Sequence, residues 1–261
     1  MNLQGKVAMI TGSTKGIGLG IAEYFAKAGA NVVIIGSSSL EVAQKVAKDI
    51  TGKTGNEALG LQINVGDESA VVAGFKATMD KFGKVDILVN NAGIQTISPF
   101  EEFSYDAWRR LLNIHIDGSF LMAKEAIKIM KNLKIRGKII NIGSVHSFVV
   151  SPNKAAYCTA KHALVGMTRS LALEGGPFGI GCNLVGPGFV MTDLVRNQIA
   201  DRARTEKMTE EEVMKSMTAN TVDGEFTTVE EVAELTLFLA ANKSNVLTGQ
   251  TIIASHGWVM N

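Results

Sequence analysis

Short apolar runs alternate along the chain with longer stretches whose apolar residues recur every three or four positions. The apolar runs are typical of strands buried on both faces, and they cover residues 6–11, 31–36, 58–64, 85–90, 137–144, 180–186 and 249–255. The stretches between them predict helices at residues 16–29, 40–50, 67–82, 106–131, 156–174 and 228–241. This alternation predicts an α/β fold, in which a single doubly wound Rossmann-type domain spans residues 1–261. Helices would cover both faces of about seven parallel strands.

Residues 187–226 interrupt the alternation, because they show no strand pattern and carry many charged side chains. A gap of this length in a compact domain usually contains structure of its own. We therefore expect two short helices here that form a lid over a substrate site. The alternative is a solvated, charged loop.

The composition narrows the class of protein. With 46% hydrophobic and 20% charged residues, the chain has the balance of a soluble globular domain. A net charge of +1 argues against nucleic acid or an anionic membrane surface as a partner. The apolar runs are too short to span a bilayer. Two cysteines without metal-ligand spacing are typical of a reducing compartment, so we expect a cytoplasmic protein without a metal site.

A glycine-rich turn, residues 11–18, lies between the first predicted strand and the first predicted helix. Its sequence, Thr-Gly-Ser-Thr-Lys-Gly-Ile-Gly, lets backbone N–H groups approach a pyrophosphate at a helix N-terminus. We therefore predict dinucleotide binding. The second strand ends in a serine run at 37–39, without the carboxylate that favours NAD or the arginine that favours NADP. Lys15 has the length to contact a 2′-phosphate or simply lies in solvent, so the choice between NAD(H) and NADP(H) stays open.

Ser144, Tyr157 and Lys161 form a candidate proton-transfer set. The tyrosine and the lysine are four residues apart, on one face of a predicted helix, and the serine ends the preceding strand. The ammonium group is expected to lower the pKa of the phenol. The phenol then exchanges a proton with a substrate oxygen, which the serine holds, while a hydride moves to or from nicotinamide. A tyrosine and a lysine at this spacing also occur for packing alone, and only the serine thirteen residues upstream makes the set specific.

The spacings Thr-Gly-x3-Gly-x-Gly and Ser-x12-Tyr-x3-Lys together resemble the short-chain dehydrogenase/reductase family. The Asn-Asn-Ala-Gly at 90–93 and the Pro-Gly segment at 187–192 resemble further segments of that family. The resemblance implies an NAD(P)-dependent oxidoreductase that acts on a CH–OH group of a small molecule and is usually a homotetramer. It implies cofactor-binding roles for Gly12, Thr14, Lys15, Gly16, Ile17, Gly18, Ser37, Asn64, Val65, Asn91, Ala92, Gly93, Tyr157, Lys161, Pro187, Gly188, Val190 and Thr192.

His115 stands where the family commonly has an asparagine that supports proton relay. We therefore count it with the catalytic set of Ser144, Tyr157 and Lys161. Ordinary packing within the helix is the alternative.

Four polar residues narrow the substrate: Gln95, His146, Lys154 and Gln198. Their segments resemble bacterial D-3-hydroxybutyrate dehydrogenases, in which such residues hold the carboxylate of a four-carbon acid. A positive charge with several donors suits a small carboxylate. Trp258 is expected to add an apolar wall, and the expected substrate site is Gln95, Ser144, His146, Lys154, Tyr157, Gln198 and Trp258.

The expected activity is the interconversion of 3-hydroxybutyrate and acetoacetate, with Tyr157 as general acid and base. The cofactor region favours an alternative, because Lys15 and the serine run resemble those of NADPH-dependent 3-oxoacyl-(acyl-carrier-protein) reductases. Another short-chain alcohol or ketone reductase is equally compatible with the motifs. A non-catalytic nucleotide-binding sensor is a remote alternative.

Overall fold

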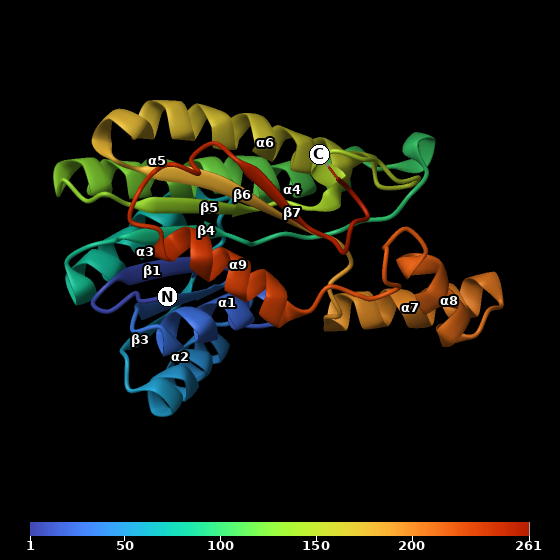
Figure 1. The fold of residues 1–261 in the computed structure, drawn as a ribbon, viewed down its shortest axis with the longest axis horizontal. Coiled ribbons are helices and arrows are strands. Elements are labelled where there is room, and N and C mark those ends of the chain that lie inside the picture. Colours follow the sequence, from blue (N-terminus) through green and yellow to red (C-terminus); the bar gives the residue numbers. More distant parts are fainter. Residues whose placement is uncertain (261) are drawn as a thin grey trace.

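Seven parallel strands form one sheet at the centre of the computed structural model, which describes residues 1–260 apart from the side chain of Leu194 (Figure 1). The strands are β1 (Val7–Thr11), β2 (Asn31–Gly36), β3 (Ala58–Gln62), β4 (Ile87–Asn90), β5 (Lys138–Ile142), β6 (Gly181–Pro187) and β7 (Thr251–Ala254). Their order is β3-β2-β1-β4-β5-β6-β7, so the strand order reverses between β1 and β4. In open α/β sheets, a ligand binds at the carboxyl ends of the strands at such a reversal.

Helices connect the strands and cover both faces of the sheet (Figure 1). They are α1 (Gly16–Lys27), α2 (Leu40–Thr54), α3 (Glu68–Phe82), α4 (Tyr105–Leu112), α5 (Gly118–Asn132), α6 (Ala155–Gly175), α7 (Asp193–Glu206), α8 (Glu210–Thr218) and α9 (Val229–Ala241). Hydrogen-bonding side chains cap several N-termini, as the sequence favours, namely Ser39, Asp67, Ser104, Thr209 and Thr228. These observations confirm the predicted fold class.

Successive residues of each strand pack on opposite faces, which explains why the strands are apolar throughout. In β1, Ala8 and Ile10 join the core under α1, α2 and α9, whereas Met9 joins the core under α3, α5 and α6. Val32 and Val33 of β2 divide in the same way. A strand buried on both faces cannot alternate between polar and apolar residues.

The single helix predicted at 106–131 is wrong in one respect, because α4 and α5 are separated by a wider π-helical turn, Asn113–Asp117. In this turn the side chain of His115 points inward, and its Nε2 lies 2.8 Å from the backbone oxygen of Ile94. The hydroxyl of Ser119 donates a hydrogen bond to the carbonyl oxygen of His115 (2.7 Å). Such wide turns frequently lie at functional sites. The periodicity of apolar residues does not reveal this change of helix type.

Residues 187–226 contain two helices, α7 and α8, which stand at one end of the sheet (Figure 1). Val195 and Ile199 of α7 pack against Val213 and Met217 of α8 in a small core of their own. The segment then rejoins the body of the protein, where Val190 and Thr227 form an isolated parallel bridge. The expected pair of helices is therefore present, and its apolar contacts are largely internal.

The first and last helices of the Rossmann core pack closely together. A Cβ atom on Gly20 of α1 would lie 2.2 Å from Cγ1 of Val229 at the start of α9. Only a glycine permits this approach. The C-terminal part of the chain therefore supports the helix that follows the glycine-rich turn. Within the described residues, none of the helices combines the length and the apolarity that a bilayer crossing requires.

Candidate active site

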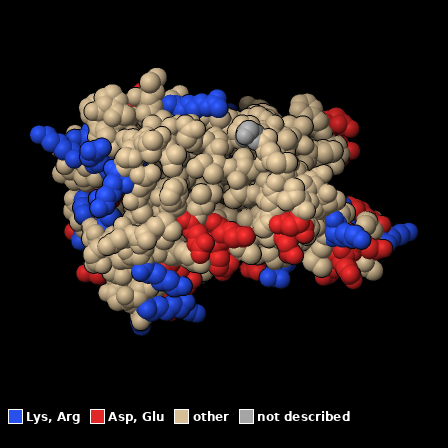
Figure 2. All heavy atoms as spheres, in the orientation of Figure 1, with Lys and Arg blue, Asp and Glu red and all other residues tan. Residues whose placement is uncertain are grey.

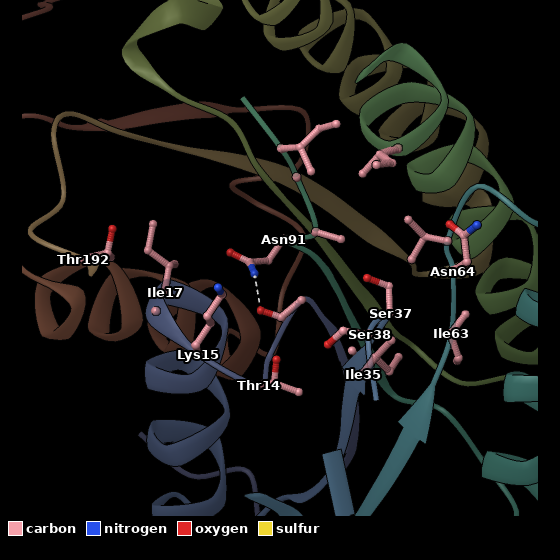
Figure 3. A pocket seen from close by; sticks show the side chains of 18 of the residues that line it. Thr14, Lys15, Ile17, Ile35, Ser37, Ser38, Ile63, Asn64, Asn91 and Thr192 are labelled. Atoms are coloured by element: carbon pink, nitrogen blue, oxygen red, sulfur yellow. Dashed lines mark hydrogen bonds between the residues drawn. The ribbon is translucent and has the colours of Figure 1, made fainter. Parts of the chain in front are cut away.

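A cavity of about 560 Å³ opens at the carboxyl ends of β1 to β4, where the strand order reverses (Figure 3). Most of the predicted cofactor-binding residues line it. They are Gly12, Thr14, Lys15, Gly16, Ile17, Ser37, Asn64, Val65, Asn91, Ala92, Gly93 and Thr192. The predicted set did not include several further lining residues, which are Ile35, Ile63 and Ile94 at or beside strand ends, Gly36 and Ser38 at the end of β2, Ile114 in the π-helical turn, and Asp193 and Asn197 on α7. The sequence does carry a signal for Ile35, Ile63 and Ile94, because each is close to a predicted cofactor-binding residue: Ser37, Asn64 and Gly93.

The shape of the glycine-rich turn fits a dinucleotide phosphate. Gly12 has a φ of +63°, and a Cβ atom there would lie 3.0 Å from the Cα of Ala92. A Cβ atom on Gly18 would lie 2.4 Å from the carbonyl oxygen of Gly12. The side chain of Asn91 fixes the turn by donating hydrogen bonds to the backbone oxygens of Thr11 (2.9 Å) and Gly12 (3.1 Å). The backbone of the turn is thus held close to the cavity. Glycine occupies the positions at which a side chain would collide with the neighbouring backbone.

The start of α1 adds donors to this wall. Its N-cap is Lys15, and within residues 1–260 no side chain caps the first turn of the helix. The first N–H groups of a helix lack intrahelical partners and carry a partial positive charge, so they attract an anion. Lys15, Ser37 and Ser38 lie around the same cavity (Figure 3). This donor set suits the phosphates and ribose hydroxyls of NAD or NADP.

A second, smaller cavity of about 60 Å³ unites every residue predicted for the substrate site. Its lining is Gln95, Ser144, Val145, His146, Lys154, Tyr157, Gly188, Phe189, Gln198 and Trp258. These residues come from six separate parts of the chain, including α7 and the segment after β7. Nε2 of Gln198 donates a hydrogen bond to Oε1 of Gln95 (2.6 Å), which links α7 to the loop after β4.

Aromatic rings form one side of the small cavity. The ring of Trp258 stacks on Phe189, with centroids 5.0 Å apart, and meets the edge of His146 at 5.9 Å. The Nζ of Lys154 lies 5.3 Å from the ring centroid of Phe189. The only ammonium group in this lining therefore lies beside an apolar wall, as a small carboxylic acid requires.

His146 is neutral in this setting. Burial, with a smaller contribution from the charge of Lys154, lowers the pKa of His146 to about 4. Its Nδ1 lies 3.3 Å from the carbonyl oxygen of Val149, and its Nε2 lies 3.4 Å from the hydroxyl of Ser151. Donation from Nδ1 to Val149 leaves Nε2 as an acceptor, so donation to a substrate carboxylate requires the other tautomer. Burial also lowers the pKa of Lys154.

Tyr157 and Lys161 do not show the expected effect on one another. Burial raises the pKa of Tyr157 to about 12, and a hydrogen bond with Ser144 only partly opposes this rise. Burial lowers the pKa of Lys161 to about 7, and its Nζ donates to the carbonyl oxygen of Ile142 (2.7 Å). The lysine therefore does not lower the pKa of Tyr157 as expected. Burial of the phenol dominates, and the ammonium group of Lys161 is directed to the carbonyl oxygen of Ile142. At neutral pH Tyr157 carries its proton.

His115 is buried, with 2% of its surface exposed, and its ring centroid lies 5.6 Å from that of Tyr157. Its Nε2 is within hydrogen-bonding distance of both backbone groups of Ile94. A Cβ atom on Gly93 would lie 2.5 Å from the imidazole Cε1. Burial, with a smaller contribution from the charge of Lys161, lowers the pKa of His115 to about 3. A neutral His115 thus supports the Asn-Asn-Ala-Gly loop beside the tyrosine.

The remaining predicted residues lie outside the lining of the larger cavity. Gly188 and Tyr157 line the smaller one instead. Lys161 and His115 lie against Tyr157. Gly18, Pro187 and Val190 are buried.

Comparisons with known proteins agree with this geometry. Residues 12–259 match the model of a family described as enoyl-(acyl carrier protein) reductase. The chain is 40% identical over 254 residues to the D-beta-hydroxybutyrate dehydrogenase of Rhizobium meliloti, covering 97% of this chain and 98% of that protein. It is 36% identical to the 3-oxoacyl-(acyl-carrier-protein) reductase FabG of Aquifex aeolicus, covering 98% of both chains.

Comparison with a solved structure agrees with these sequence similarities. The crystal structure of a short-chain type dehydrogenase/reductase from Mycobacterium marinum superposes with a TM-score of 0.89 at 29% identity, covering 100% of this chain and 98% of that one. The glycine-rich turn, the seven-stranded sheet and the sequence matches all point the same way: this chain is an oxidoreductase of the short-chain dehydrogenase/reductase family.

Proposed function

We propose that this protein interconverts 3-hydroxybutyrate and acetoacetate with a nicotinamide dinucleotide. The observation that carries the proposal is the small cavity in which Lys154, Gln95, Gln198 and His146 surround Tyr157. Similarity to the D-beta-hydroxybutyrate dehydrogenase of Rhizobium meliloti supports the same substrate. A charged amine and amide donors hold a carboxylate at one end of the cavity, and the rings of Trp258 and Phe189 restrict the length of the chain.

The proton chemistry follows from the protonation of Tyr157. Because burial keeps the phenol protonated at neutral pH, Tyr157 donates its proton to the carbonyl oxygen of the keto acid in the direction of reduction. The direction of oxidation requires the phenolate form of Tyr157, which then accepts the proton of the alcohol. The hydroxyl of Ser144 holds the same substrate oxygen, and Lys161 lies beside the tyrosine, with its Nζ 5.4 Å from the centroid of the Tyr157 ring. The cofactor, when bound, supplies or accepts the hydride.

The residues around the larger cavity hold the cofactor in this proposal. The glycine-rich turn and the start of α1 bind the pyrophosphate, and Asn64 and Val65 contact the adenine. Ser37 and Lys15 contact the adenosine ribose, with or without a 2′-phosphate, so both NAD(H) and NADP(H) remain candidates. Residues 187–226 act as the lid, and the hydrogen bond between Gln198 and Gln95 holds it against the loop after β4 until substrate binds.

We further propose that each chain folds as a single domain and that four copies form a homotetramer. We place this enzyme in the cytoplasm. Phe238 on α9 and Val246 before β7 are exposed apolar side chains, which supports an interface near the C-terminal strand. Sedimentation of the purified protein measures the oligomeric state. A monomer across micromolar concentrations would contradict this part of the proposal.

A 3-oxoacyl thioester reductase is the second candidate, because Lys15 and the serines at 37 and 38 line the cofactor cavity, and residues 37–39 after β2 include no carboxylate. Similarity to the FabG of Aquifex aeolicus supports the same alternative. Such an enzyme has no need for Lys154 in its substrate cavity. The two functions therefore differ in the effect of removing this charge.

The test is a spectrophotometric assay of nicotinamide reduction at about 340 nm. 3-Hydroxybutyrate is supplied with NAD and with NADP, beside an acetoacetyl thioester with either reduced cofactor. We expect turnover of the free acid, and we expect Lys154→Met to raise its KM by about 10- to 100-fold, the usual loss of a hydrogen-bonded charge. Exposed Lys48 supplies the matched control, Lys48→Met. The second candidate is favoured if Lys154→Met leaves thioester reduction unchanged and the free acid is not oxidised.

A further inference from the structure

A tight turn at residues 255–258 carries Trp258 into the substrate cavity. The amide of Trp258 donates to the carbonyl oxygen of Ser255 (3.0 Å), and the two central residues, His256 and Gly257, have φ values of +50° and +72°. Two consecutive positive φ values define a type I′ turn, which favours glycine, asparagine and aspartate at these positions. A histidine in this conformation costs free energy unless its surroundings fix it there.

The side chain of His256 joins three parts of the chain. Its Nδ1 lies 2.7 Å from Oδ2 of Asp223, in the segment by which the lid returns to the body after α8. Its Nε2 lies 3.5 Å from Oε2 of Glu231, at the start of α9. Its backbone oxygen accepts a hydrogen bond from the amide of Val222 (2.8 Å). Figure 2 shows acidic side chains gathered over α9 and beside the lid segment.

The Gly257 side of the turn is also closely packed. A Cβ atom on Gly257 would lie 2.7 Å from Cγ1 of Val222, so the turn packs directly on the lid's return segment. The ring of Trp258 then stacks on Phe189, at the beginning of the same lid. The two ends of residues 187–226 are therefore both in contact with the turn.

We propose that His256 is a positioning residue, whose ion pairs with Asp223 and Glu231 fix the turn and thereby hold Trp258 and the lid in the geometry that closes the substrate cavity. This inference rests on the proposed function only where it predicts an effect of His256 on the KM for 3-hydroxybutyrate. The placement of Trp258 is independent of the substrate.

The ion pairs make this positioning dependent on pH. The hydrogen bond to Asp223 is the main cause that raises the pKa of His256 above its ordinary value of 6.5. The imidazolium therefore holds both carboxylates at low pH, and the clamp weakens as the pH rises through the raised pKa. Asp223 and Glu231 are the charged groups that face His256. His146 faces the other side of Trp258, but it titrates at about 4, outside this range.

The first experiment measures Trp258 directly, without substrate. A Trp108→Phe background leaves Trp258 as the only tryptophan, and acrylamide quenching reports its exposure. We expect quenching to rise between pH 6 and 9 with a midpoint above 6.5. His256→Gly relieves the positive φ and removes the clamp, so its quenching is high throughout. His256→Asn keeps a neutral donor in place of Nδ1 and accepts positive φ, so its quenching is independent of pH and equals that of the parent above the pKa of His256.

The second experiment uses the kinetics. His256→Gly raises the KM for 3-hydroxybutyrate about tenfold, equivalent to ~1.4 kcal/mol, with kcat and the KM for nucleotide little changed. Asp223→Asn produces the same change, and the double variant is no worse than either single one. His256→Asn gives a KM between that of His256→Gly and that of the parent at low pH.

Quenching in His256→Gly equal to that of the parent at pH 6 would overturn the inference. If Trp108→Phe does not fold, the difference between the full protein and its Trp258→Phe variant supplies the same signal. An enzyme that ignores 3-hydroxybutyrate but shows the quenching pattern contradicts the proposed substrate and leaves the role of His256 intact. Equal losses of kcat and of nucleotide binding in His256→Gly would mean that the residue only stabilises the fold.

Discussion

Gln198 on α7 and Gln95 after β4 are joined by a hydrogen bond of 2.6 Å, although 103 positions separate them in the chain. The bond closes the small cavity on the side of the proposed lid. In the proposed function both amides turn to a substrate carboxylate when it binds, because a charged acceptor forms the stronger hydrogen bond.

The first prediction concerns this pair. Gln198→Ala and Gln95→Ala should each raise the KM for the acid by about 10-fold or more, since a hydrogen bond to a charged group contributes about 1.5–3 kcal/mol. Steady-state kinetics with varied 3-hydroxybutyrate measure the change. Exposed Gln250 provides a control, and Gln250→Ala should leave the KM unchanged. An unchanged KM in both cavity variants would remove the glutamines from the substrate site.

The second prediction concerns the proton donor. Tyr157→Phe should lower kcat by roughly 10²- to 10⁴-fold, because only the hydroxyl that exchanges the proton is lost. Nucleotide binding, measured by titration calorimetry, should persist, since the larger cavity is intact. The matched control is Tyr105→Phe, on an exposed position of α4, with the activity of the parent. Substantial turnover by Tyr157→Phe would refute the assigned role.

The third prediction concerns stability in acid. Burial lowers the pKa of His115 to about 3 and of His146 to about 4, from an ordinary value of 6.5. The unfolded chain therefore binds more protons than the folded protein below pH 6.5, and the free energy of unfolding falls as the pH drops. The loss is about 3 kcal/mol for His146 and about 5 kcal/mol for His115 once the pH is below the pKa of each histidine in the folded protein.

Urea unfolding between pH 4 and 7 tests this linkage. His146→Gln should flatten the decline of the unfolding free energy with falling pH, and exposed His162→Gln should leave the decline as it is. The same slope in His146→Gln and the parent would show that His146 is not held neutral.

The fourth prediction concerns the cofactor. A carboxylate at the end of β2 accepts the ribose hydroxyls of NAD and repels a 2′-phosphate. Ser37→Asp should therefore change the ratio of kcat/KM values by about tenfold or more in favour of NAD, whichever cofactor the parent prefers. Exposed Ser170 provides the control, and Ser170→Asp should leave the ratio unchanged. An unaltered ratio in Ser37→Asp would place the ribose elsewhere.

The sequence predicted the strands and helices well because their signal is local. Each strand of a sheet covered on both faces is an apolar run, and the boundaries of β2 match the prediction residue for residue. The small cavity was also foreseen, since Ser144, Tyr157 and Lys154 lie in one short stretch and Gln95 follows a recognised motif. Motifs at strand ends meet because a parallel sheet brings those ends together.

Features that depend on packing were not predictable. The π-helical turn places His115 in contact with Ile94, a residue twenty-one positions away. The raised pKa of Tyr157 depends on how deeply the phenol is buried, which periodicity does not specify. The contact between His256 and Asp223 joins two segments that carry no shared motif. In each case the decisive partner is distant in the chain.

The close contact between Gly20 and Val229 also has a consequence for synthesis of the protein. The helix that follows the glycine-rich turn leaves the ribosome early, but its packing partner is translated more than two hundred residues later. A nascent chain therefore cannot form the contact that supports α1 until translation is nearly finished. Prematurely terminated products would lack this support behind the glycine-rich turn, and they are expected to be less stable than the finished protein.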